Sequence, residues 1–173
     1  MKTVKVLVAA SMAAALLAGC GSKTDTDTFR FASELDIQGM DSTVVDDGMS
    51  FNAIHAITDG LTAVNEKGKT APAIAKSWDV SDDGKTYTFH LRDAKWTNGD
   101  KVTANDFVYS WRKIIKDAGN YAYMLGSGGA SVKNADALME LGANATDEQM
   151  ATLGVTAKDD QTLVVELENK VPY

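Results

Sequence analysis

Two regions of the chain alternate apolar and polar side chains, and this alternation predicts two β-hairpins. Apolar residues occupy every second position in residues 78–80 and 87–91, on either side of the turn Ser81-Asp82-Asp83-Gly84. The same pattern occupies residues 163–167, after a turn formed by residues 158–161. Because successive side chains of a strand point to opposite faces, each hairpin is expected to bury one face. The glycine of the first turn can adopt the positive φ that such a turn requires.

Apolar residues recur every three to four positions in two other stretches, and this spacing predicts helices. The first stretch is residues 49–61, where Gly60 occupies a position at which a helix would stop. The second is residues 102–117, where Thr103 can cap the helix start and Asp106 occupies the capping-box position three residues later. The residues expected to form the apolar stripe of this second helix are Phe107, Trp111, Ile114 and Ile115.

Shorter extended segments are expected between and before these elements. Phe29 and Phe31 alternate with polar neighbours, which predicts an opening strand within residues 28–36. Short extended pieces are expected on either side of the turn at residues 65–68. Asn98-Gly99 predicts a further tight turn.

The region after the second helix is interpreted as a linker followed by two short helices. The glycine-rich stretch 126–131 lacks the lysine of a phosphate-binding loop, and we interpret it as a flexible linker. Residues 134–142 and 146–154 are each expected to form a short helix that a glycine ends. Strands and helices are mixed along the chain, so the predicted fold class is α+β.

The first 28 residues differ in composition from the rest of the chain. Residues 1–19 combine two lysines with a short apolar run and small residues at the end, which is typical of an export signal. The run is shorter than the roughly 20 apolar residues of a membrane span. The alternative, a buried N-terminal helix, suits an alanine-rich run without a polar face poorly. Residues 20–28 are almost entirely polar and predict a flexible tether.

The composition argues against several classes of function. The chain of 173 residues has 24 acidic and 17 basic residues and a net charge of −7, whereas nucleic-acid binding needs a basic surface. Cys20 is the one cysteine of the sequence, and His55 and His90 lie far from it. This distribution argues against a disulfide framework and against a zinc site. No metal and no other cofactor is expected.

No catalytic motif is recognisable in the sequence. There is no Gly-x-Ser-x-Gly elbow and no His-Glu-x-x-His helix. His90 falls on the polar side of a predicted strand, and His55 falls off the apolar stripe of a predicted helix, so surface or packing roles are expected for both. The aspartates include no isolated pair in an apolar setting, as acid–base catalysis by carboxylates requires. The protein is therefore expected not to be an enzyme.

Residues 71–113 contain a dense series of short motifs, which are Ala71-Pro72-Ala73, Ser77-Trp78, Asp83-Gly84, Tyr87-Thr88-Phe89-His90-Leu91-Arg92, Lys95-Trp96, Asn98-Gly99-Asp100, Thr103-Ala104 and Asp106-Phe107-Val108-Tyr109-Ser110-Trp111. With this series the chain resembles the peptide-binding lipoproteins of ABC importers, the oligopeptide-binding members of the bacterial extracellular solute-binding proteins, family 5. A second block, residues 153–173, is similar to a later part of the same family.

A second resemblance concerns the N-terminus. Leu17-Ala18-Gly19-Cys20 resembles the lipobox of bacterial lipoproteins. The resemblance implies that the chain is cut before Cys20 and that the Cys20 sulfur carries a diacylglycerol. Two or more long acyl chains would hold the protein at the extracytoplasmic face of the cell membrane, because each buried methylene contributes about 0.8 kcal/mol.

The family resemblance implies a partial periplasmic-binding-protein type II fold. Members of the family have about three times this length, with two lobes, a cleft and an extra domain packed on the first lobe. Residues 29–173 would supply the start of lobe one and most of the extra domain. The sequence is therefore expected to be an N-terminal fragment, from a truncated gene or an incomplete sequence.

The resemblance also implies ligand-binding residues. Asp46, Asp47, Gly48 and Met49 fall where relatives line the cleft, through backbone contacts more than side chains. Tyr121 matches a tyrosine that faces the ligand in relatives, although Asn120 replaces the usual proline before it. The alternative for Tyr121 is packing within the extra domain. We interpret the three tryptophans of the motifs as core residues: Trp78, Trp96 and Trp111.

The function implied is that of a lipid-anchored receptor that captures oligopeptides for an ABC importer. Its expected partners are oligopeptides, the permease subunits and the membrane, with no nucleic acid, and the protein is expected to be a monomer. One alternative is a receptor for signalling peptides or another solute, since relatives in the superfamily bind dipeptides, nickel complexes or haem. The other is a surface lipoprotein without a transport role, or an inert remnant.

Overall fold

The computed structural model describes residues 31–172 of the chain. The expected export signal, Cys20 and the tether lie outside the described residues. The chain divides after Glu34, and every described helix and strand belongs to the part that follows. None of the described helices is long and apolar enough to cross a membrane.

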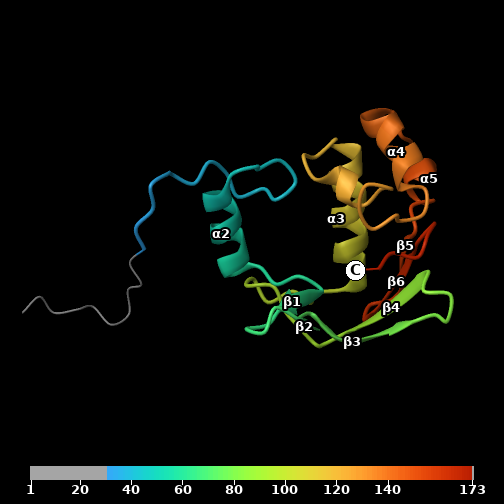
Figure 1. The fold of residues 1–173 in the computed structure, drawn as a ribbon, viewed down its shortest axis with the longest axis horizontal. Coiled ribbons are helices and arrows are strands. Elements are labelled where there is room, and N and C mark those ends of the chain that lie inside the picture. The colour runs from blue at the N-terminus through green and yellow to red at the C-terminus, as the bar shows by residue number, and fades with distance from the viewer. Residues whose placement is uncertain (1–30, 173) are drawn as a thin grey trace, which may run out of the picture. The chain divides into compact units, whose positions relative to one another are not determined.

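The two predicted hairpins are confirmed, and they join into one antiparallel sheet (Figure 1). The order of its strands is β3 (Ala75–Val80), β4 (Thr86–Leu91), β6 (Thr162–Glu166) and β5 (Val155–Asp159). The central pair, β4 and β6, comes from different hairpins, so about 70 residues of chain separate two neighbouring strands. Gly84 in the first turn has φ +70°, as expected for this position.

The second hairpin buries one face more completely than the first. Leu163 and Val165 of β6 are 0% and 3% exposed. In the first hairpin Leu91 is fully buried, but Tyr87 and Phe89 are only half-buried and Val80 is 46% exposed. The expectation of a buried face is thus met for β6 and only in part for β3 and β4.

A small hairpin of β1 (Thr62–Val64) and β2 (Thr70–Pro72) matches the extended pieces predicted around the turn at 65–68. The helices are α2 (Gly48–Ile57), α3 (Ala104–Lys116), α4 (Ala135–Leu141) and α5 (Asp147–Met150), with 3-10 turns η2 (Ala122–Met124) and η3 (Gly142–Asn144). The helices α3, α4 and α5 lie on one side of the four-stranded sheet, and α2 and the small hairpin lie beyond the β3 end of it (Figure 1).

Helix α3 begins where the capping motif predicts and packs on β5 and β6. The carboxylate of Asp106 accepts hydrogen bonds from the Thr103 backbone N–H at 2.7 Å and from its hydroxyl at 3.1 Å. The most buried residues of the helix, however, are Ala104, Val108 and Ile115. Of the predicted stripe, Ile115 is buried, whereas Phe107, Trp111 and Ile114 are half-buried and pack against the core. Phe107 and Trp111 also line an open cavity, which leaves this side of α3 partly exposed.

Two other expectations differ from the structure. Of the expected opening strand, residues 28–30 lie outside the described residues, and residues 31–36 form no strand, with Phe31 64% exposed. Residues 126–131 are not a flexible linker. Their backbone N–H groups bond within a compact turn, from Gly129 to the carbonyl of Gly126 at 3.0 Å and from Ala130 to the carbonyl of Met124 at 2.7 Å. The glycines permit this close packing, because a Cβ on Gly129 would lie 2.1 Å from the Met124 carbonyl oxygen.

Candidate functional site

Helix α2 starts inside the stretch predicted to line a ligand cleft. Asp47 is its N-cap, and Asp47 Oδ1 accepts a hydrogen bond of 2.8 Å from the Ser50 backbone N–H. The Ser50 hydroxyl oxygen, fully buried, accepts hydrogen bonds from the backbone N–H groups of Gln38 at 3.0 Å and Gly39 at 3.1 Å. Ser50 therefore ties the preceding loop to the first turn of α2.

The hydroxyl and backbone N–H of Ser50 lower the pKa of the Asp47 carboxyl below its ordinary value of 3.8. A carboxyl whose pKa is depressed in the folded protein stabilises it above the unfolded pKa. That stabilisation is lost as the pH falls through the lowered, folded-state pKa. The start of α2 should therefore keep its cap well into mildly acidic solution.

We expect Asp47→Ala to fray the first turn of α2, whereas Asp46→Ala should leave it intact, because the exposed Asp46 does not cap the helix. The readout is hydrogen exchange at the Ser50 amide, which should become several-fold faster in Asp47→Ala. Asp47→Asn should retain slow exchange, since asparagine is an equally good cap. Equal exchange in the two alanine variants would contradict this role for Asp47.

The loop after α3 is fastened to the chain just before α2. Its residue Asn120 donates from its backbone N–H to the Thr43 carbonyl at 3.1 Å and from its side-chain amide to the Val44 carbonyl at 2.6 Å. Gly119 approaches so closely that a Cβ there would lie 2.4 Å from the Thr43 carbonyl oxygen. Asn120 thus holds this loop by both its backbone N–H and its side-chain amide.

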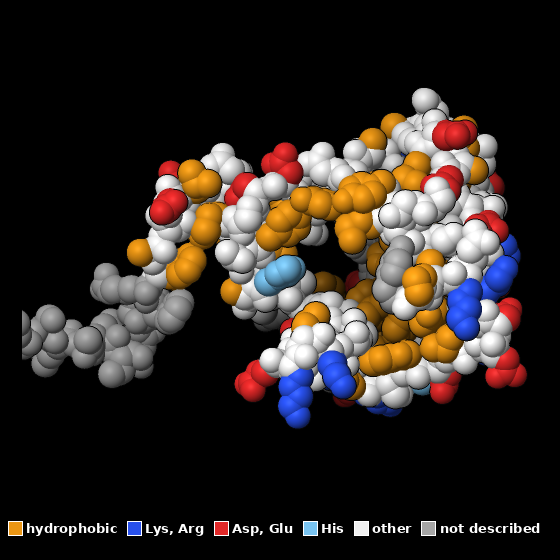
Figure 2. Space-filling view, in the orientation of Figure 1, with side chains coloured by type: hydrophobic (Ala, Val, Ile, Leu, Met, Phe, Trp, Pro, Cys, Tyr) orange, Lys and Arg blue, Asp and Glu red, His pale blue; other side chains and the backbone are white. Residues whose placement is uncertain are grey.

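This attachment brings Tyr121 against the first turn of α2. The rings of Tyr121 and Phe51 meet edge to face, with centroids 5.3 Å apart. The ring centroid of Tyr123 lies 6.3 Å from that of Tyr121, and the ring centroid of His55 lies 6.2 Å from that of Phe51. We call Phe51, Tyr121 and Tyr123 the aromatic row. Figure 2 shows hydrophobic side chains gathered on this side of the molecule, from α2 towards the upper end of α3.

The structure therefore brings together some of the predicted ligand-binding residues. Tyr121 is half-buried on α2, the helix that begins at Gly48, rather than inside the core under the sheet. Asp46 is exposed just before the helix. Gly48 and Met49 lie in the helical first turn, so their backbone cannot form a strand-like ladder with a ligand. Cys20 lies outside the described residues.

Two members of the aromatic row were not predicted from the sequence as site residues. Phe51 lies in the stretch 49–61 that was predicted as a helix, and Tyr123 was assigned no role. A second tyrosine two positions after Tyr121 is the sequence signal that could have pointed to Tyr123, but only Tyr121 matched the family pattern. Contact between Phe51 and Tyr121 joins residues 70 positions apart, and local sequence gives no sign of it.

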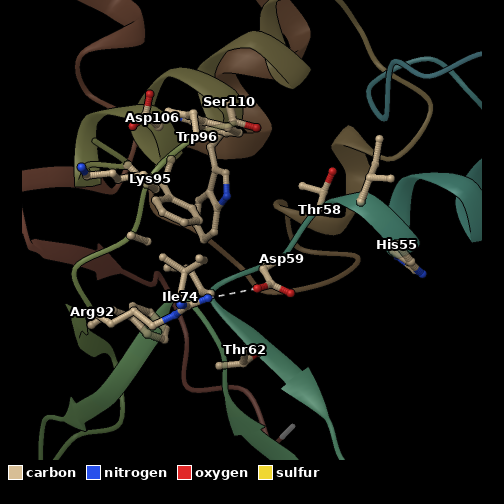
Figure 3. A pocket seen from close by; sticks show the side chains of 18 of the residues that line it. His55, Thr58, Asp59, Thr62, Ile74, Arg92, Lys95, Trp96, Asp106 and Ser110 are labelled. Atoms are coloured by element: carbon tan, nitrogen blue, oxygen red, sulfur yellow. Dashed lines mark hydrogen bonds and ion pairs between the residues drawn. The ribbon is translucent and has the colours of Figure 1, made fainter. Parts of the chain in front are cut away.

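A second feature is an open cavity of about 1420 Å³ between the α2–β1 connection, β4 and α3 (Figure 3). Part of its lining is polar: Arg92 forms an ion pair of 3.1 Å with Asp59 and donates from Nε to the Ala73 carbonyl at 2.9 Å. The volume of the cavity exceeds the roughly 300–1,000 Å³ of small-ligand pockets.

A large, open and mainly apolar surface of this kind is typical of a contact with further polypeptide. The aromatic residues in its lining are Trp78, Tyr87, Phe89, Trp96, Phe107, Tyr109 and Trp111.

The tryptophans differ from the expectation that all three are core residues. Trp96 is 47% exposed, and its ring points into the cavity (Figure 3). Trp78 and Trp111 are half-buried and also line the cavity. The expectation was wrong for Trp96, because an aromatic residue at a strand or helix period can equally face an open cavity.

The histidines show no catalytic arrangement. His90 Nε2 lies 2.7 Å from Asp79 Oδ2 on the neighbouring strand, at the exposed edge of the sheet, as the sequence predicted for a surface residue. His55 is exposed on α2 beside Phe51. Within residues 31–172 no three histidine, cysteine or carboxylate side chains gather as metal ligands.

Comparisons with known proteins agree with the resemblance seen in the sequence. The family model described as "Bacterial extracellular solute-binding proteins, family 5 Middle" matches residues 69–173. The "Dipeptide-binding protein" of Lactococcus lactis is 38% identical over 180 residues, covering 100% of this chain and 31% of the relative. "Periplasmic oligopeptide-binding protein OppA" of Escherichia coli is 36% identical over 184 residues, covering 99% and 32%.

Solved structures of similar proteins carry the same fold. The substrate-binding domain of an oligopeptide ABC transporter from Bacillus anthracis has a TM-score of 0.74 at 38% identity, covering 83% of this chain and 26% of that one. Haemophilus influenzae OppA in complex with the peptide RPPGFSPFR has a TM-score of 0.71 at 40% identity, covering 79% and 26%.

The mixed α/β architecture matches part of these type II periplasmic-binding-protein structures, and the relatives are binding proteins rather than enzymes. The chain spans about a third of the length of the curated relatives that it matches. A family model that covers residues 69–173, together with relatives of this identity, settles the family. The chain belongs to the bacterial extracellular solute-binding proteins of family 5.

Proposed function

We propose that this protein is an extracellular, lipid-anchored receptor that captures oligopeptides for an ABC importer. The observation that carries the proposal is the aromatic row: Tyr121 lies against the helix whose start was predicted to line the cleft. Relatives named as oligopeptide-binding and dipeptide-binding proteins support peptides as the solute. In this proposal the protein works as a monomer and delivers its solute to the permease subunits in the membrane.

The proposed mode of binding follows from what peptides share. A receptor for many sequences must recognise the backbone, whose N–H and C=O groups pair with the protein as an added strand would. Side chains then enter hydrated pockets, where water adapts the hydrogen bonding. Closure of two lobes around the ligand would signal the permease, and the ligand can drive closure only by binding the closed state more tightly.

In this proposal residues 29–173 are the first part of a longer solute-binding domain. The open cavity supports this organisation, because its aromatic lining would be covered by further polypeptide in a protein of the relatives' length. Residues 1–19 would be removed as a signal peptide, and residues 20–28 would form the tether. Mass spectrometry of the protein expressed in a bacterium tests the anchor: Cys20 should carry a diacylglycerol, and an unmodified thiol would refute it.

Calorimetry tests the peptide proposal directly. The full-length protein should bind components of a mixed pool of short peptides with micromolar or tighter affinity. Tyr121→Ala should weaken binding of all of them, because the ring belongs to the proposed cleft wall. Residues 20–173 alone should bind poorly, since they supply one side of the enclosure. A full-length protein that binds no peptide would favour the alternatives: a receptor for another solute, or a surface lipoprotein without a transport role.

A further inference from the structure

Tyr123 has the exposure and the support of a contact residue. The residue is 56% exposed, although it lies between the buried Ala122 of η2 and a turn with several backbone hydrogen bonds. One part of the ring is held beside Tyr121, with centroids 6.3 Å apart. Another part faces Gly128, where a Cβ would lie 3.8 Å from Tyr123 Cδ2. The ring is therefore supported by its neighbours and still offers apolar surface to solvent.

The turn that carries Gly128 is rigid, and so the support of the ring is rigid too. Asp136 at the start of α4 accepts hydrogen bonds from the Ser127 backbone N–H at 3.0 Å and 3.1 Å. The Ser131 N–H bonds to the Gly126 carbonyl at 2.8 Å, and the Val132 N–H bonds to the Leu125 carbonyl at 2.7 Å. A fixed aromatic ring loses little conformational freedom when another side chain packs on it, which makes it an efficient contact surface.

The surroundings of the ring are apolar. Val44, whose carbonyl anchors Asn120, is 55% exposed, and Met124 next to Tyr123 is 53% exposed. The rings of Tyr121 and Tyr123 contact each other, and Tyr121 contacts Phe51, so the surface favours an apolar or aromatic partner over an ionic one. This surface continues from Tyr121, the residue proposed to face the peptide.

We propose that Tyr123 is a specificity-determining residue of the peptide site. An apolar or aromatic side chain of the bound peptide packs on its exposed ring, and the protein therefore prefers peptides with such a residue at one position. This inference rests on the proposed function. Aromatic contacts of this kind, together with the apolar area they bury, correspond to a preference of about tenfold.

The test uses the full-length protein and alanine peptides in which phenylalanine replaces each alanine in turn. The wild type should bind one of these peptides about tenfold more tightly than the all-alanine peptide. In Tyr123→Ala this ratio should fall towards one, and in Tyr123→Phe it should persist. Val64→Ala is the control: Val64 is also an exposed apolar residue, at 76%, but it lies on β1, outside both the aromatic row and the cavity lining, so the ratio should not change.

The outcomes separate this inference from the function on which it rests. Peptide binding without any preferred position, or a preference that survives in Tyr123→Ala, overturns the role of Tyr123 while the peptide receptor stands. Loss of affinity for all peptides alike in Tyr123→Ala, with the ratio unchanged, also overturns it. Absence of binding to every peptide overturns the proposed function, and the role of Tyr123 with it.

Discussion

Leu163→Ala is expected to lower the free energy of unfolding by about 2–5 kcal/mol, the largest stability effect that we predict. Leu163 is 0% exposed in β6 and pairs in register with Phe89 on one side and Ala157 on the other. Removing its side chain leaves a cavity between the sheet and α3 that rigid neighbours cannot fill. A domain of this size is stabilised by about 5–15 kcal/mol in total, so the loss is a large fraction of it.

Leu141→Ala is the matched control, because the chemical change is the same at a position that is 37% exposed at the end of α4. It should change the free energy of unfolding by about 0.5 kcal/mol or less. Urea unfolding followed by circular dichroism measures both, and the midpoint should move with the slope preserved. Equal midpoints for the two variants would contradict the assignment of Leu163 to the core.

Gly129→Ala is expected to destabilise the protein by about 1–3 kcal/mol. A Cβ at this position would lie 2.1 Å from the Met124 carbonyl oxygen and 2.6 Å from its carbon. The clash is with backbone, which cannot rotate away, and the same carbonyl accepts the hydrogen bond from Ala130. Accommodating one methyl group would therefore break the turn that connects η2 to α4.

Gly128→Ala tests this interpretation, because the adjacent glycine has no atom nearer than 3.7 Å to its built Cβ. Neither glycine has a positive φ, so the comparison isolates steric contact from backbone strain. Gly128→Ala should be close to neutral, within about 1 kcal/mol. Thermal unfolding of the two variants provides the measurement. If both were neutral, residues 126–131 would be the flexible linker that the sequence suggested.

The hairpins and the cap of α3 show what local sequence can predict. Alternation in residues 163–167 requires a strand with one buried face, and Leu163 and Val165 are buried accordingly. Thr103 and Asp106 form their cap within three residues of each other. Both features depend on interactions between near neighbours, and such interactions are encoded in a few adjacent positions.

The candidate site could be predicted only in part. The resemblance pointed to Tyr121 and to the start of α2, but their mutual contact depends on Asn120 reaching the Val44 carbonyl across 76 positions of sequence. The rigidity of residues 126–131 depends on the proximity of Asp136 and Met124, which composition alone cannot reveal. A glycine-rich segment is predicted to be flexible unless the carbonyl groups that accept hydrogen bonds from its backbone N–H groups are known.

By itself the sequence determined most of the helices and strands, the two hairpins with their turns, and the family, because periodicity, turn residues and contiguous motifs are local properties of the chain. Only the tertiary structure decided which apolar face of α3 is buried, that Trp96 opens into a cavity, and that Phe51, Tyr121 and Tyr123 stand in one row. The physical reason is that burial and ring contact are set by which distant segments come together. The same apolar residue can fill a core or remain available to a ligand, and its own neighbours in sequence do not distinguish the two.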